Sequence, residues 1–236
     1  MSDGPKKLSF FDHLEELRFR IIKCLAAFLI ASVVFSRYLD PILAFIIEPI
    51  GRLVFTYPSE AFLARIALIC WGGLIVSFPY ILYELWQFVS LGLTAKEKRY
   101  ILFFGPVSLI FFVLGAVFGY LVMVPMSMQF FLGFASDWMI PMITVNQYVS
   151  YVGNMIFAFG IVFELPVVLL FLTKIGIATP AFLTQKRPYM IVGIFIVSAV
   201  LTPPDIASQL LMAVPLLVLY EIGVVVAKIV YRFKDH

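Results

Sequence analysis

The sequence predicts an all-α integral membrane protein whose six transmembrane helices form a single membrane domain over residues 1–236. Three observations support this prediction. Hydrophobic residues make up 63% of the chain and charged residues only 13%, whereas a soluble domain carries about 25% charged residues. The apolar residues gather into six runs, which polar and proline-containing segments separate. Finally, 14 of the 17 Lys and Arg residues lie in cytoplasmic segments or at their edges if the N-terminus is placed in the cytoplasm.

An amphipathic segment precedes the first apolar run. In residues 10–20, FFDHLEELRFR, apolar side chains recur at helical spacing and charged side chains occupy the flanks. This pattern predicts a helix that lies in the membrane interface with its charges in the headgroup water. Two interpretations of the charges remain open. Glu16 and Arg20 form an i,i+4 pair of a basic anchor helix, or the segment offers carboxylates to a cationic partner.

The segment between the first two apolar runs, residues 37–65, is too polar and too rich in proline to cross a membrane. We expect it to form a structured outer loop of short helices, with Pro49 among its prolines. The fifth run is short: its helix would measure about 20 Å against about 30 Å of hydrocarbon. Thr202-Pro203-Pro204-Asp205 ends it. The predicted spans cover residues 21–36, 66–89, 101–124, 148–172, 189–201 and 206–227.

The positions of Lys and Arg predict the orientation of the chain. With a cytoplasmic N-terminus, only Arg37, Arg52 and Arg65 lie outside, all in the first outer segment. The outer loops around Asp137 and Asp205 contain neither Lys nor Arg. Because positive charge is retained on the cytoplasmic side, we expect both termini to be cytoplasmic.

Four motifs occur in order along these loops and spans. They are HLEELRFR at 13–20, FVSLGLTAKEKR at 88–99, FAFGIVFELP at 157–166, and KRPY with LTPPD between 186 and 205. With them the chain resembles the TatC family, the multispanning core subunit of the twin-arginine protein translocase, over about residues 8–229. The resemblance implies a receptor for folded cargo whose signal peptide carries two consecutive arginines, and export driven by the proton-motive force. It also implies TatA- and TatB-type single-span partners and self-association in a multi-subunit complex. The expected location is the cytoplasmic (inner) membrane of a prokaryote or its organellar equivalent.

The resemblance assigns a signal-peptide site to five residues. Glu16 and Glu97 match the two acids that meet the signal arginines in the family, Arg18 and Arg20 match its basic positions, and Phe88 matches its nearby aromatic position. The chemistry fits, because a guanidinium group binds a carboxylate with two parallel hydrogen bonds. For Glu97, the alternative is a solvated loop acid whose charge the neighbouring basic residues offset.

Two further acids lie inside apolar runs. Glu164 falls well within the fourth span, and intramembrane acids are candidate functional residues. The resemblance implies a polar site for partners or signal; the alternative is a structural acid bonded to carbonyls that Pro166 frees. Glu84 departs from the family, which more often has an uncharged Gln there. Glu84 either adds a negative charge near the cytoplasmic face, where the resemblance places signal recognition, or extends its side chain to the membrane surface. Leu91 replaces a family proline, which places the loop geometry in question.

Other classes of function are disfavoured. The sequence lacks phosphate-binding, nucleophile-elbow and HExxH motifs, so neither an enzyme nor a cofactor is expected. Its basic residues are scattered, which argues against nucleic-acid binding. His13 and Glu16 together supply too few ligands to bind a metal ion. Two alternatives remain. One is a proton-coupled small-solute transporter that uses Glu164 as its relay, and the other is a passive assembly scaffold in which no single acid matters.

Overall fold

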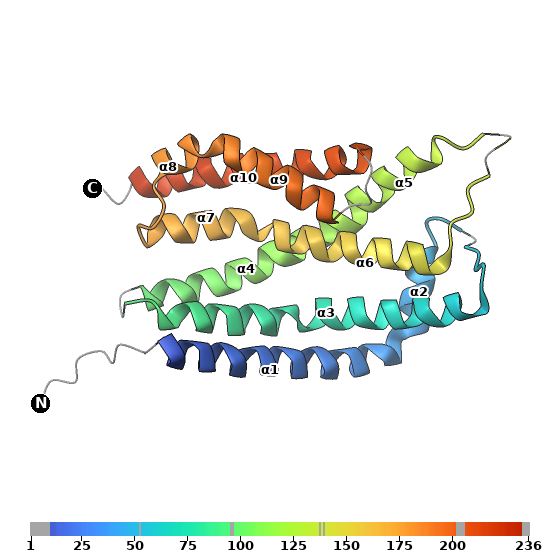
Figure 1. Cartoon of the computed structure of the whole chain (residues 1–236), viewed down its shortest axis with the longest axis horizontal. Helices are drawn as coiled ribbons and strands as arrows, with labels where there is room; N and C mark the ends of the chain where they lie inside the picture. Colours follow the sequence, from blue (N-terminus) through green and yellow to red (C-terminus); the bar gives the residue numbers. More distant parts are fainter. Residues whose placement is uncertain are drawn as a thin grey trace, which may run out of the picture.

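The computed structural model describes residues 10–51, 53–94, 97–136, 138, 140–201 and 206–232. In these ranges the chain is a bundle of helices that lie side by side (Figure 1). Five helical runs are long and apolar enough to cross a membrane, and one further apolar helix is shorter. This architecture confirms the all-α fold class that the composition predicts.

The first helix, α1 (Phe10–Phe35), includes the amphipathic segment. The sequence predicted a separate interfacial helix over residues 10–20, and this prediction is wrong. These residues form the first turns of the same helix that continues into the first apolar run. The reason is local: the sequence from Phe10 to Phe35 contains neither glycine nor proline, so nothing interrupts the backbone hydrogen bonds. α1 packs against α3 (Pro58–Leu91).

The outer segment between α1 and α3 is structured, as expected. A 3-10 turn, η1 (Ser36–Tyr38), leads into the short helix α2 (Leu39–Ile47). The chain beyond α2 pairs with the segment before α6: the Val54 amide donates to the Ile143 carbonyl at 3.2 Å, and the Val145 amide donates to the Val54 carbonyl at 3.0 Å. These bonds fasten two outer connections that are far apart in sequence.

The helix that follows α3 does not end at residue 124, where the predicted third span ends, but continues through Pro125. α4 (Lys98–Phe118) continues through a π-helical turn, η2 (Gly119–Met123), into α5 (Val124–Leu132). Proline is tolerated there because the π-helical turn just before it adjusts the backbone hydrogen-bond pattern at the place where the ring supplies no N–H.

The second half of the bundle begins with α6 (Val145–Val162) and α7 (Glu164–Lys174). The two helices are separated at Phe163, and Pro166, which has no N–H to donate, follows three residues later. The short α8 (Pro180–Gln185) then leads into α9 (Arg187–Leu201) and α10 (Ile206–Arg232).

Close helix contacts in the centre of the bundle depend on small residues. The position that a Cβ on Gly115 of α4 would occupy lies within 3.0 Å of the Phe159 carbonyl oxygen of α6, and one on Gly160 would meet the Phe112 ring. Small residues let membrane helices approach closely where no hydrophobic force between them is available. α4 and α6 therefore pack backbone to backbone.

One end of the bundle gathers the connections that the charge distribution predicts to be cytoplasmic. Figure 1 shows the start of α1, the connection from α3 to α4, the end of α7, α8 and the end of α10 at the same end. α2 and the connection from α5 to α6 lie at the opposite end. We call the first of these the inner end and the second the outer end. The start of α1 and the end of α10 thus lie at the same end of the bundle, as the predicted orientation requires.

Candidate functional site

A network of charged side chains joins α1 to α3 near the inner end. Arg20 of α1 is its centre. One terminal nitrogen, Nη2, lies 2.5 Å from Glu16 Oε1, and the other, Nη1, donates to Glu84 Oε2 at 2.8 Å and to the Glu84 carbonyl at 3.3 Å. The i,i+4 pair that the sequence predicts within α1 is therefore present, and a second carboxylate from another helix shares the same guanidinium group.

The three side chains differ sharply in exposure. The Glu84 side chain is 5% exposed and that of Arg20 13%, whereas the Glu16 side chain is 37% exposed. Two more groups satisfy Glu84: the Tyr80 hydroxyl donates to its Oε1 at 2.9 Å, and the Lys23 ammonium lies 3.8 Å from the same atom. Glu84 is therefore a buried, paired carboxylate that does not extend to the surface, and Glu16 is the acid that solvent can reach.

A ring contact holds the start of α1 against the last turns of α3. The rings of His13 and Phe88 lie 4.5 Å apart between centroids and are tilted by 34°. Glu16 is three residues beyond His13 on α1, and the loop that carries Glu97 begins just after Phe88. This contact brings the Glu16 helix and the Glu97 loop to the same end of the bundle (Figure 1).

Glu97 itself has a structural role that the sequence interpretation missed. Its Oε2 accepts hydrogen bonds from the backbone amide and from the hydroxyl group of Thr94, both at 2.8 Å. The spacing Thr-x-x-Glu before a helix is a capping box, in which the glutamate satisfies an amide at the helix start. That signal is visible in the TAKE sequence. The capping bonds fix one carboxylate oxygen of Glu97 just before α4.

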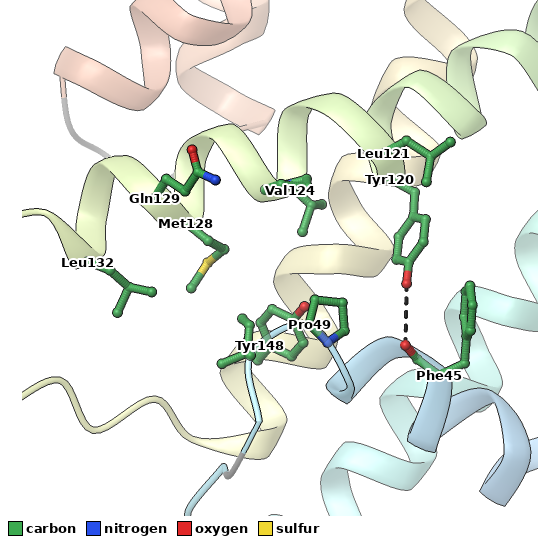
Figure 2. Close-up of a pocket in the computed structure, with 11 residues that line it drawn as sticks. Phe45, Pro49, Tyr120, Leu121, Val124, Met128, Gln129, Leu132 and Tyr148 are labelled. Atoms are coloured by element: carbon green, nitrogen blue, oxygen red, sulfur yellow. Dashed lines mark hydrogen bonds between the residues drawn. The ribbon is translucent and has the colours of Figure 1, made fainter.

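The other candidate residues lie apart from this network. Arg18 is exposed on α1, and Asp205 lies outside the described residues. Pro49 follows α2 at the outer end, where it lines an apolar pocket of about 390 Å³ (Figure 2). The phenol groups of Tyr120 and Tyr148, which also line it, donate to backbone carbonyls of α2 at 3.4 and 3.1 Å. Pro49 is thus an exposed residue that lines a pocket at the end of the bundle opposite the charged network.

Glu164 begins α7 and points into the bundle, since it is only 9% exposed. Its carboxylate interacts with the hydroxyl group of Ser108 on α4, and that hydroxyl also accepts a hydrogen bond from the Trp86 indole at 3.2 Å. The second carboxylate oxygen, Oε1, is buried with no hydrogen-bond partner among the described residues. The fold therefore places Glu164 in a largely apolar interior, with the hydroxyl of Ser108 beside it.

The described part of the chain contains no group of three or more His, Cys, Asp or Glu side chains that could hold a metal ion. His13, the candidate beside Glu16, instead packs against Phe88. The features that remain are a bundle of apolar helices and, at its inner end, carboxylates held in place by ion pairs and a helix cap. These features define a polytopic membrane protein with a network of paired carboxylates at its inner end.

Comparison with known proteins places the chain among protein translocases. Residues 12–215 match the family "Sec-independent protein translocase protein (TatC)". The chain is 40% identical over 235 residues to the TatC protein of Carboxydothermus hydrogenoformans, covering 98% of this chain and 96% of that one. It is 32% identical to TatCy of Bacillus subtilis, covering 96% and 91% of the two chains. A crystal structure of the twin-arginine translocase receptor TatC superposes with a TM-score of 0.82 at 38% identity, covering 92% of this chain and 98% of that one.

The chain belongs to the TatC family. It is accordingly a membrane-embedded subunit of the twin-arginine, Sec-independent protein translocase, and its family is one of transport components rather than of catalysts. Neither the comparisons nor the described structure supports the alternative of a small-solute transporter.

Proposed function

We propose that this subunit is the receptor for twin-arginine signal peptides, with Glu16 and Glu97 as the acceptors of the two arginines. The observation that supports this most is the juxtaposition at the inner end. The contact between His13 and Phe88 holds the start of α1, which carries Glu16, against the last turns of α3, after which the loop with Glu97 begins. Two carboxylates on different elements, each with its backbone fixed, suit a ligand with two neighbouring guanidinium groups.

The surrounding residues support the two acceptors in different ways. Phe88 fixes the position of the α1 start through its ring contact, and Arg20 is the partner of Glu16 in the absence of a ligand. Arg18 is exposed and has the same charge sign as the ligand, so we assign it to the flank of the site. There, a cation suits the anionic lipid headgroups of a cytoplasmic leaflet.

The wider assembly is part of the same proposal. We place the protein in the cytoplasmic membrane of a prokaryote, in a complex with TatA- and TatB-type single-span subunits and with further copies of itself, and driven by the proton-motive force. Many large apolar side chains of α1, α4 and α10 are exposed in the isolated chain, and lipid or apolar partner helices would cover them. Glu164 is the candidate polar contact for a partner or signal, because a buried carboxylate oxygen without a hydrogen-bond partner leaves bonding capacity available.

A double-mutant cycle tests the two acceptors. The full chain in nanodiscs is titrated with a synthetic signal peptide that carries Arg-Arg, Arg-Lys, Lys-Arg or Lys-Lys ahead of an apolar stretch. Glu16→Gln and Glu97→Gln should each weaken binding of the Arg-Arg peptide about ten- to a hundredfold, the equivalent of one hydrogen bond to a charged group. The effect of each substitution on affinity should largely disappear when the peptide arginine that this acid contacts has already been replaced by lysine.

Glu15→Gln is the matched control, since Glu15 is an exposed acid on the same helix but on the other flank. It removes the same charge and should leave the affinity almost unchanged. If the coupling is near zero for every pair of acid and arginine, while the variants stay folded, the assignment of Glu16 and Glu97 is wrong.

A further inference from the structure

Glu16 can offer both carboxylate oxygens to a cationic ligand only if it gives up its present partner. Its carboxylate already lies 2.5 Å from Arg20, whose side chain is 13% exposed. If Arg20 had no other acceptor, an incoming guanidinium that took Glu16 would leave a largely buried positive charge without a carboxylate. Removing one partner of a buried ion pair is strongly unfavourable for this reason.

Glu84 supplies the second acceptor. Its side chain is 5% exposed, and both its Oε2 and its backbone carbonyl accept from Arg20 Nη1. Its remaining carboxylate oxygen is held by Tyr80. The bond from Tyr80, one turn earlier on α3, anchors Glu84 independently of Glu16, so Arg20 keeps a paired, hydrogen-bonded position even when Glu16 turns toward a ligand.

Charge leads to the same conclusion. The cluster of Glu16, Arg20, Lys23 and Glu84 contains two negative and two positive groups, whereas an uncharged side chain at position 84 would leave one unit of excess positive charge beside Glu16. Excess positive charge there would repel an arginine ligand and bind Glu16 more firmly to Arg20.

We propose that Glu84 is a positioning residue of the cationic site: by holding Arg20 it releases Glu16 to exchange partners with an incoming guanidinium group. This inference rests on the proposed function, because it takes Glu16 as an acceptor of a signal-peptide arginine. It assigns to Glu84 an effect on ligand affinity although its buried carboxylate lies behind Arg20.

The test uses the full chain in nanodiscs and the synthetic Arg-Arg peptide, with the Lys-Lys peptide as a reference. Glu84→Gln should raise the Kd for the Arg-Arg peptide about tenfold, because Arg20 then has Glu16 as its main acceptor. Adding Arg20→Gln to Glu84→Gln removes the competing cation and should restore the affinity to within about threefold. A purely structural role for Glu84 predicts the opposite, since the second substitution further weakens the link between α1 and α3.

Two further variants separate the possible failures. Glu221→Gln removes a carboxylate that joins two other helices, through its 2.6 Å pair with Arg187, and should leave peptide binding unchanged. If Glu16→Gln weakens binding but Glu84→Gln does not, or if Arg20→Gln gives no rescue, the role of Glu84 is refuted and the proposed receptor function stands. If Glu16→Gln itself has no effect, it is the assignment of Glu16 in the proposed function that fails.

Discussion

The close packing of α4 on α6 should make Gly115 intolerant of even one methyl group. A Cβ at this position would lie within 3.0 Å of the Phe159 carbonyl oxygen and 2.8 Å from Phe163 Cβ and Cγ. Real Cβ atoms essentially never approach other atoms so closely. The nearest obstacle is backbone, which cannot rotate away, so Gly115→Ala must push the two helices apart.

The expected cost comes from this geometry. Overpacking of a tight interface costs about 1–3 kcal/mol, and alanine recovers about 0.5–1 kcal/mol because it favours a helix more than glycine does. Gly115→Ala should therefore lower the free energy of unfolding by about 0.5–2 kcal/mol. Gly105→Ala on the same helix is the matched control, since a Cβ there meets no atom within 4 Å. It should leave stability unchanged or raise it slightly.

Equilibrium unfolding in mixed micelles of mild detergent and SDS, followed by circular dichroism, measures both variants. The reasoning is refuted if Gly115→Ala and Gly105→Ala unfold at the same SDS fraction. It is also refuted if a structure of the Gly115→Ala variant shows α4 and α6 at unchanged separation.

Two other predictions concern export. α9 has fifteen residues and is about 22 Å long, whereas the hydrocarbon layer is about 30 Å thick, so the short helix should thin the bilayer locally. An extra apolar turn between Ile194 and Val200 should therefore impair export of a folded reporter without preventing insertion. Unchanged export would exclude a role for local bilayer thinning. Glu164→Leu should leave the free energy of unfolding unchanged or raise it, because it removes a buried oxygen without a hydrogen-bond partner. The same variant should nevertheless lower export more than Glu164→Gln does. Full export by both variants would leave Glu164 with a structural role only.

The sequence predicted the fold class because hydropathy and the positions of Lys and Arg are properties of each segment by itself. Helix ends were less well predicted, since each depends on whether the neighbouring residues can continue the helix. Residues 10–20 have an interfacial pattern, but nothing separates them from the span, and α1 continues through them. The predicted third span ends at residue 124, but the helix continues through Pro125, which lies just after the π-helical turn.

The candidate site was predicted only in part, for a different reason. The pair between Glu16 and Arg20 is expected from helical spacing, and the cap at Glu97 could have been found from its Thr-x-x-Glu pattern. The link from Arg20 to Glu84 joins residues 64 positions apart. No periodicity within one segment could show it, because it depends on which helix packs beside which.

The π-helical turn η2 also sets the phase of the helix after it. Nineteen residues separate Ser108 of α4 from Ser127 of α5, and both serines are buried. In an uninterrupted α-helix, successive residues advance by about 100°, so Ser127 would face about 100° away from Ser108. A π turn absorbs one additional residue and cancels that rotation. The run from Lys98 to Leu132 therefore keeps a single buried stripe along its length. A one-residue insertion or deletion in Gly119–Met123 would rotate all of α5 by about 100° and turn its buried face away from the bundle.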